Sequence, residues 1–469
     1  MTIDIKNLTI KKAGEMLRSG EVTSVEIVKE CLKNIEEKNK ELNIFLEVFD
    51  DALDQAKKAD EMMKNGKGGE LCGIPIALKD NILITGKKNS SGSKILENYV
   101  ASYDANVVKK LKEAGAVLIG RTNMDEFAMG SSTENSAYGP VKNPLDPTRV
   151  PGGSSGGSSA SVVAGMALGS LGSDTGGSIR QPASFCGIVG MKPTYGGVSR
   201  YGLTAMSSSL DVIGPFAKTT EDAEIIFECI SGKDKMDATS RDVLSKAEIL
   251  KISPRKVIGV PRDFLKEGVD KDVLKNFEEV LEKLKANGFE IKDIELPYTK
   301  YSLAVYYIIM PAEVSTNLSR LDGVRYGLRK EGESMFDTYK KSRSAGFGAE
   351  TRRRVILGTY VLSHGYYDAY YNKAWEVRRA IAKEYEEVFK DVDFVLTPTT
   401  PTPAFKFGEK SDPVQMYLSD IFTVSANLVG LPSISIPSGF SSDNLPLGAL
   451  FTAPIGKDFS LFEMEKYIK

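Results

Sequence analysis

A dense run of glycine and serine between Gly152 and Arg180 carries the residue types that acyl-transfer chemistry needs. Ser154, Ser155 and Ser178 place hydroxyl groups within it, and its glycines let the backbone approach a ligand closely. Successive N–H groups in such turns can bind an anion. The run is too apolar for a flexible linker, because it contains Val162, Val163, Met166 and Leu168. The pattern predicts a serine nucleophile beside an oxyanion hole.

A serine nucleophile needs a base, and the chain offers two kinds. His364 is the one histidine, and Gly-x-Ser154-x-Gly fits the nucleophile-elbow pattern with a histidine downstream. That elbow must follow a strand, whereas the preceding segment 143–151 holds three prolines and favours a loop. The other activator is a buried lysine. Lys79 ends the apolar run 74–78, and burial would lower the pKa of its amine, although this run also fits a surface lysine at a strand end.

Three motifs together resemble the amidase signature family. They are the Gly/Ser run itself, the segment Gly172–Ala183 and the segment Gly190–Thr194. Three more segments resemble, within that family, the glutaminase subunits of tRNA-dependent amidotransferases: 123–134, 318–327 and 342–348. The resemblance extends from about residue 7 to about residue 439 and weakens beyond it.

The resemblance implies a Ser–cis-Ser–Lys triad. Ser178 would be the nucleophile, Ser154 would pass on its proton from a residue with a cis peptide bond, and Lys79 would be the base. Four consecutive backbone amides would form the oxyanion hole: Thr175, Gly176, Gly177 and Ser178. We also expect Arg180 to pair with Asp174, because the two residues flank the nucleophile, and to hold this loop rigid.

A glutamine substrate carries an α-carboxylate and an α-ammonium group, so its pocket needs a cation and an anion. Arginine suits a carboxylate because its planar fork donates two hydrogen bonds. By resemblance, Arg354 would bind the α-carboxylate, Asp420 would bind the α-ammonium, and Tyr306 would line the pocket. Of the three arginines in 352–354, we expect two to lie on a solvated helix face. By the same resemblance, Met129, Gly130 and Ser131 would lie near the side-chain amide of the substrate. Met129 also fits an ordinary residue of the apolar core.

The expected elements alternate between helix and apolar strand, which predicts an α/β fold. The resemblance adds a large mixed β-sheet covered by helices on both faces, in a single domain over residues 1–469. Within that domain, residues 1–65 would be an N-terminal helical layer and 66–220 the core with the Gly/Ser motifs. Residues 221–469 would hold the remainder of the sheet and the helices of the glutamine pocket.

Local patterns predict individual elements. A capping box at Thr23–Glu26 starts one helix, and a charged helix is expected over 45–64. A strand is expected over 73–80, then a helix over 104–115 and a strand over 116–120. Further elements are expected later: strand 256–260, helix 270–287, strands starting at 288 and 394, and a late strand over 427–437.

The composition argues against several functional classes, namely nucleic-acid-binding, secreted, membrane-spanning and zinc-binding proteins. The 61 Lys and Arg nearly balance the 63 Asp and Glu, so the net charge of −2 gives no electrostatic footprint for nucleic acid. Segment 1–6 lacks the apolar core of a secretory signal, and no apolar run approaches the roughly 18 residues of a membrane span. Four scattered cysteines favour a reducing cytoplasm and no zinc site: Cys31, Cys72, Cys186 and Cys229.

The resemblance implies a cytoplasmic glutaminase subunit that forms a heterotrimer with subunits B and C. Glutamine would acylate Ser178 and release ammonia. A partner subunit would use ATP and Mg to activate glutamyl-tRNA(Gln) or aspartyl-tRNA(Asn), and would hold most of the tRNA. This chain would bind no metal or cofactor of its own. The alternatives are a free-standing amidase of the same family and a phosphate- or nucleotide-binding module built on the Gly-rich loop. The second is disfavoured because the chain lacks the G-x-x-x-x-G-K-[ST] motif.

Overall fold

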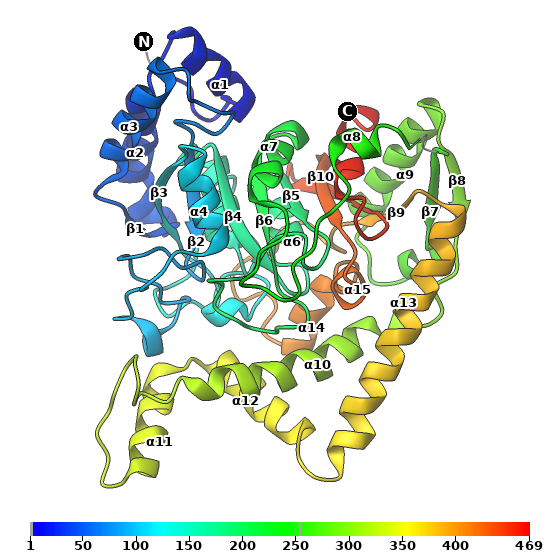
Figure 1. Ribbon diagram of the computed structural model, residues 1–469. Helices are drawn as coiled ribbons and strands as arrows, with labels where there is room; N and C mark the ends of the chain where they lie inside the picture. The colour runs from blue at the N-terminus through cyan, green and yellow to red at the C-terminus, as the bar shows by residue number, and fades with distance from the viewer. Residues whose placement is uncertain (1–2, 253–254) are drawn as a thin grey trace.

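The structure is a computed structural model that describes residues 3–252 and 255–469 (Figure 1). Residues 1–2, at the start of the predicted helical layer, and 253–254 lie outside this description. In the described part of the chain, eleven strands form one sheet in the order β1-β3-β2-β4-β6-β5-β10-β11-β9-β7-β8. Their bounds are β1 Phe45–Val48, β2 Pro75–Lys79, β3 Val117–Thr122, β4 Gly169–Asp174, β5 Val189–Lys192, β6 Val212–Ala217, β7 Val257–Val260, β8 Glu290–Asp293, β9 Phe394–Pro398, β10 Ser433–Phe440 and β11 Pro446–Thr452.

Helices surround this sheet and also extend away from it. The α-helices are α1 Ile10–Ser19, α2 Ser24–Leu42, α3 Ala52–Lys64, α4 Asn106–Glu113, α5 Gly156–Val163, α6 Arg180–Cys186, α7 Thr220–Ile230, α8 Lys246–Ile249, α9 Lys271–Ala286, α10 Ser302–Asn317, α11 Met335–Gly346, α12 Ala349–Val361, α13 Lys373–Asp391, α14 Pro413–Tyr417 and α15 Val424–Val429. The 3-10 segments include the short turns η2 Glu126–Ala128 and η7 Leu418–Asp420 and the ten-residue segment η8 Asp458–Tyr467. Figure 1 shows α11, α12 and the start of α13 projecting beyond the body that contains the sheet.

The sheet is mixed, as predicted. β2 runs parallel to both β3 and β4, and β7 runs parallel to β8 and β9. The central pairs β4–β6, β5–β6, β10–β5 and β10–β11 are antiparallel. Because β2 and β4 are parallel neighbours, their carboxyl ends meet at one edge of the sheet, where open α/β sheets bind ligands.

Helices cover both faces of the sheet, which confirms the predicted fold class. Every residue of β2, β3, β4 and β6 is buried. A side chain added at Gly169 would meet Ile226 of α7, and one at Gly172 would meet Ser155, which precedes α5. Residues three apart in a strand point to opposite faces, so α7 and α5 lie on opposite sides of β4.

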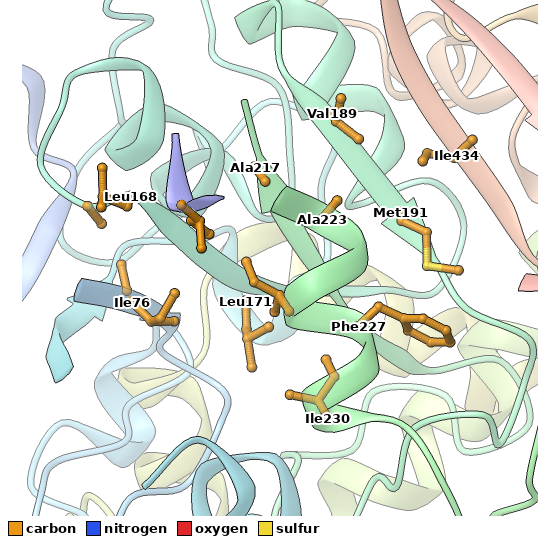
Figure 2. Close-up of a cluster of buried hydrophobic side chains, with 14 of the residues drawn as sticks. Ile76, Leu168, Leu171, Val189, Met191, Ala217, Ala223, Phe227, Ile230 and Ile434 are labelled. Atoms are coloured by element: carbon orange, nitrogen blue, oxygen red, sulfur yellow. The ribbon is translucent and has the colours of Figure 1, made fainter. Parts of the chain in front are cut away.

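The apolar core lies under the strands that carry the Gly/Ser motifs. Figure 2 shows Ile76 of β2, Leu171 of β4 and Met191 of β5 grouped with Phe227 of α7. These side chains belong to one buried cluster that continues to Ile434 of β10. The ends of β2 and β4 therefore project from a close-packed support, whose interior resists displacement.

Most predicted elements are present, with two corrections. α2 begins with the expected capping box, in which the Thr23 side chain and Glu26 bond reciprocally to the backbone. The helix predicted over 45–64 is wrong at its start, because Phe45–Val48 pairs with β3 as an edge strand and the helix begins only at Ala52. The strand predicted over 427–437 is wrong at its start too, because α15 continues to Val429 and β10 begins at Ser433.

Candidate active site

Lys79 is the last residue of β2, and its amine is enclosed by three serines. Its side chain is fully buried. Nζ lies 2.8 Å from Ser154 Oγ, 2.7 Å from Ser155 Oγ and 2.9 Å from Ser173 Oγ. Burial lowers the pKa of the Lys79 amine to about 7, although three nearby carboxylates oppose this shift. Lys79 is therefore a lysine that can be neutral near physiological pH.

The peptide bond between Gly153 and Ser154 is cis. Its surroundings hold it on both sides. The N–H of Gly153 donates to Gln181 Oε1 at 2.9 Å, and the carbonyl of Ser154 accepts the N–H of Asp125 at 3.2 Å. Ser154 is fully buried. The structure thus places a buried serine, in the peptide geometry that the resemblance implies, in direct contact with Lys79.

Ser178 is the most accessible of the three predicted triad residues. It is 8% exposed, whereas Lys79 and Ser154 are 0% exposed. Within the described residues its hydroxyl makes no hydrogen bond, so the structure contains the Lys79–Ser154 contact but no hydrogen bond between Ser154 and Ser178. Exposure and a free hydroxyl are what a nucleophile that meets substrate requires.

Asp174 organises the loop that carries Ser178. Its carboxylate accepts the N–H groups of Gly177 at 2.9 Å and Ile179 at 3.0 Å. Arg180 donates to both of its oxygens, through Nε at 3.1 Å and Nη2 at 2.9 Å. Burial alone would raise the pKa of Asp174, but the Arg180 guanidinium holds it down at about 2. The predicted Asp174–Arg180 pair is confirmed.

The N–H groups of this loop divide into two sets. Those of Thr175, Gly176 and Ser178 make no hydrogen bond within the described part of the chain, so they are available to an oxyanion. The prediction for Gly177 needs correction, because its N–H already donates to the Asp174 carboxylate. Its place in the loop is set by a close approach, since an added Cβ would lie 2.4 Å from Thr423 Oγ1.

The predicted substrate residues come from four separate segments that converge on this loop. Asp420, in η7, accepts the hydroxyl of Ser131 at 2.7 Å. An added Cβ on Gly177 would lie 3.3 Å from Asp420 Oδ1, and one on Gly176 would lie 2.7 Å from Tyr306 Cζ. Burial raises the pKa of Asp420 to about 7. An anion and a phenol therefore border the candidate oxyanion hole.

Arg354, on α12, is a buried cation that is paired with Glu350. Its residue is 3% exposed, and its guanidinium lies 5.4 Å from the ring centre of Tyr307 and 5.5 Å from that of Tyr417. Nε donates to Glu350 at 2.7 Å, and Nη1 makes a weaker contact with the Met310 sulfur at 3.7 Å, so the plane of the group is fixed. The other two arginines of 352–354 are exposed, as predicted.

Met129 and Gly130 are packed against residues of the protein interior. Met129 is fully buried in an apolar cluster with Tyr306, in agreement with its interpretation as core. An added Cβ on Gly130 would lie 2.3 Å from Asp125 Cγ. Asp125 was not among the predicted site residues. It is fully buried, accepts the N–H groups of Thr133 and Asn135, and borders Gly153, so it holds together the loops on either side of the cis peptide.

Ser155, Ser173 and Asn427 also belong to the site without having been assigned a role. Ser155 and Ser173 contact Lys79, and Asn427 bonds to both Asp174 and Arg180. One sequence signal could have found Ser173, because it is the polar residue that directly precedes Asp174 at the end of an apolar strand. His364 is exposed in the turn after α12 and takes no part in these hydrogen bonds, so a histidine-based triad finds no support.

The described residues contain neither a metal-binding cluster nor a membrane-spanning helix. No group of three or more His, Cys, Asp or Glu side chains there is arranged to hold a metal ion. Over the same residues, none of the helices combines the length and the apolar character that crossing a membrane requires. The four cysteines, Cys31, Cys72, Cys186 and Cys229, are free thiols.

A buried lysine bonded to a cis-peptide serine, beside a loop with free N–H groups, is a site for amide hydrolysis, and the sequence pattern of the Amidase family matches residues 26–462. The chain belongs to the amidase family. Among the solved structures it resembles the peptide amidase of Stenotrophomonas maltophilia, at 26% identity and a TM-score of 0.81, with 98% of this chain and 96% of that chain covered.

Other relatives place the chain more narrowly. The A subunit of the glutamyl-tRNA(Gln) amidotransferase of Koribacter versatilis is 54% identical over 453 residues, which cover 95% of this chain and 94% of that protein. The corresponding protein of Carboxydothermus hydrogenoformans is 51% identical and covers 97% and 95%. The crystal structure of the Thermotoga maritima protein has 44% identity and a TM-score of 0.82, with 99% and 95% covered. Within the amidases, the chain belongs with the glutamyl-tRNA(Gln) amidotransferase A subunits.

Proposed function

We propose that the chain hydrolyses glutamine as the glutaminase subunit of a glutamyl-tRNA(Gln) amidotransferase. Its ammonia would convert Glu-tRNA(Gln) to Gln-tRNA(Gln), with Asp-tRNA(Asn) as the alternative acceptor. One observation carries the proposal: besides the Lys79–Ser154 contact, the predicted substrate residues include a buried cation, Arg354, which is paired with Glu350, and a buried carboxylate, Asp420, beside the Ser178 loop. Free amino acids carry both complementary charges, whereas simple amides carry neither.

The triad would work through proton transfers. The Oγ of Ser178 attacks the side-chain amide carbon of glutamine, and its proton passes to Ser154 as the proton of Ser154 passes to the neutral amine of Lys79. The carbonyl oxygen becomes an oxyanion, which the free N–H groups of the loop stabilise. When the C–N bond breaks, the Lys79 ammonium returns a proton through Ser154 to the leaving ammonia. Water then enters by the same route, and the ester on Ser178 is released as glutamate.

The pocket would orient the amino acid by its two charges. Asp420 accepts the α-ammonium, and Arg354 donates from its terminal nitrogens to the α-carboxylate. Tyr306, from α10, packs against Gly176. Ser131 keeps the Asp420 carboxylate oriented through the 2.7 Å hydrogen bond. Met129 and Gly130 precede that serine, the first buried in the core and the second packed against Asp125.

The remaining assignments concern the assembly. We propose that the chain works in the cytoplasm as a single domain within a heterotrimer with subunits B and C. A partner subunit would use ATP and Mg and would hold most of the tRNA, because a net charge of −2 gives this chain little attraction for phosphates. The relatives in Koribacter and Carboxydothermus are subunits by name, which supports an assembly of this kind.

Ammonia release from glutamine is the decisive measurement, made with and without subunits B and C and beside a panel of simple amides. We expect glutamine turnover that rises with the partners and that Ser178→Ala and Lys79→Ala each abolish. His364→Ala, at an exposed position outside the site, is the matched control and should keep wild-type turnover. Fast hydrolysis of other amides by the isolated chain, with glutamine ignored, would instead establish a free-standing amidase.

A further inference from the structure

We propose that Ser173 and Asn81 are positioning residues that direct the lone pair of the Lys79 amine toward Ser154. This inference rests on the proposed role of Lys79 as the base. Both residues are buried at the end of the Lys79 strand and its neighbour: Ser173 is 2% exposed and Asn81 is 3% exposed. Neither contacts Ser178 through a hydrogen bond in the described part of the chain, so any effect on catalysis must pass through Lys79.

The argument begins with a count of protons on Nζ. A neutral amine has two N–H bonds and one lone pair, yet Nζ faces three hydroxyl oxygens at 2.7–2.9 Å. Only one of the three hydroxyls can donate to the lone pair, and the two N–H groups then point to the other two hydroxyl oxygens, since the one further acceptor at Nζ among the described residues, the Ser173 carbonyl, is more distant at 3.4 Å. Lys79 can take a proton from Ser154 only when neither Ser155 nor Ser173 donates to that lone pair.

Ser155 is committed to that role by its own neighbour. Its Oγ lies 3.1 Å from the carbonyl oxygen of Ser173, which accepts the Ser155 proton. The oxygen of Ser155 also accepts the N–H of Ser173 at 3.4 Å, which leaves one lone pair for Lys79, at 2.7 Å. Ser155 therefore does not compete with Ser154 for the lone pair of the amine.

Among the described residues, Ser173 has one alternative to Lys79 for its proton, and that alternative is Asn81. The Asn81 amide lies 2.9 Å from Ser173 Oγ, with its nitrogen as donor. Its oxygen, Oδ1, is buried and has no hydrogen-bond partner within the described residues. Half a turn of the amide brings this unpaired oxygen to the hydroxyl, where it accepts the Ser173 proton. Ser173 can then only accept from Lys79, and the lone pair is left to Ser154.

Two measurements test the positioning role of Ser173 and Asn81, and one of them does not use glutamine. The first is the rate at which a fluorophosphonate labels Ser178 as a function of pH, and the second is kcat and KM for glutamine in the complex with subunits B and C. In Ser173→Ala we expect labelling and kcat to fall about tenfold, the order of one lost hydrogen bond, with KM unchanged. The acid limb of the pH profile should move to lower pH, because the Lys79 ammonium loses an acceptor.

Two further variants sharpen the test. Asn81→Asp should move the acid limb to higher pH, because a carboxylate two hydrogen bonds from Nζ favours the ammonium, and Ser173→Thr should restore the wild-type profile by keeping the hydroxyl. Ser170→Ala is the matched control: Ser170 is a fully buried serine of the same strand that donates to the Ser158 carbonyl at 2.7 Å and does not bond to Lys79. The Ser170→Ala variant should keep the acid limb of its pH profile at the wild-type position.

The inference is overturned if Ser173→Ala and Ser170→Ala have the same kcat and the acid limb of their labelling profiles at the same pH. It is also overturned if Asn81→Asp moves the acid limb to lower pH. If Ser173→Ala does not fold, the direction in which Asn81→Asp moves the acid limb still tests the inference. Failure of the proposed function looks different. A wild-type chain that the probe does not label removes Ser178 as nucleophile, and a labelled chain that ignores glutamine changes the substrate but leaves the labelling profiles to decide about Ser173.

Discussion

Replacing Arg180 by methionine tests whether the nucleophile loop is held by buried charge. Arg180 is fully buried and donates to three residues: Asp174 at 2.9 and 3.1 Å, the carbonyl of Thr423 at 2.9 Å and Asn427 at 2.6 Å. Arg180→Met keeps much of the volume and removes the charge. The carboxylate of Asp174 then stays buried, with Asn427 and two backbone N–H groups but no cation.

The expected loss of stability follows from this geometry. Removing one partner of a buried ion pair costs about 3–5 kcal/mol. An unfolding entropy of about 2.1 cal/mol/K per residue gives a 469-residue chain about 1 kcal/mol/K, so the melting temperature should fall by about 3–5 °C. Turnover should fall further. Misplacement of the oxyanion N–H groups, which belong to the loop that Asp174 holds in place, costs about 100- to 1000-fold in kcat.

Scanning calorimetry and glutamine hydrolysis measure the two effects side by side. Arg379→Met, at an exposed position of α13, is the matched control and should change the unfolding free energy by less than about 0.5 kcal/mol. The double variant Asp174→Asn with Arg180→Met removes the unpaired charge and should recover most of the melting temperature but not the activity. Full turnover in Arg180→Met, or a melting temperature within about 1 °C of wild type, would refute a loop held by this pair.

Three other perturbations follow from the site. Because only neutral Lys79 can accept a proton and its pKa is lowered to about 7, kcat/KM for glutamine should rise as pH increases through 7 and then level off; a flat pH–rate profile between about 6 and 8 contradicts this. Asp420, whose pKa is raised to about 7, loses its charge as pH falls, so KM should rise below pH 7. Asp420→Asn should raise KM about 10- to 100-fold, the order of a charge-assisted hydrogen bond, and abolish that pH dependence in steady-state kinetics. Gly176→Ala should lower turnover, since its Cβ would lie 2.7 Å from Tyr306 Cζ, whereas Gly69→Ala, with no atom within 4 Å, should be neutral; equal activity of the two variants in the ammonia assay would be the contrary result.

The elements that sequence patterns predicted are those whose signal is local. Lys79 ends an apolar run, and that run is a strand buried along its whole length, as a fully covered sheet requires. The capping box of α2 needed only four consecutive residues. The prediction of a helix over 45–48 was wrong because the strand there depends on a distant partner. The charged residues that follow do form a helix, but Phe45 pairs with Thr122, far along the chain.

The contacts that the sequence could not reveal join distant segments. Asn427 bonds to Asp174 across 253 positions, and Ser131 bonds to Asp420 across 289. No periodicity or spacing encodes such pairs, because the sheet and helix packing brings them together only in the folded chain. Family resemblance supplied Asp420 as a site residue, yet it gave no indication that Asn427 completes the Asp174–Arg180 pair or that Ser173 borders Lys79.

The strand order carries a consequence for synthesis on the ribosome. β10 and β11 are the last two strands to be translated, yet they lie in the interior of the sheet, between β5 on one side and β9 on the other. Until they emerge, β7, β8 and β9 have no strand through which to join the part that holds Lys79 and Ser178. A nascent chain that stops after β9 would also lack Asp420 and Asn427. Such a chain would expose two unpaired sheet edges, so we expect a need for chaperone protection late in translation and no ammonia release from incomplete chains.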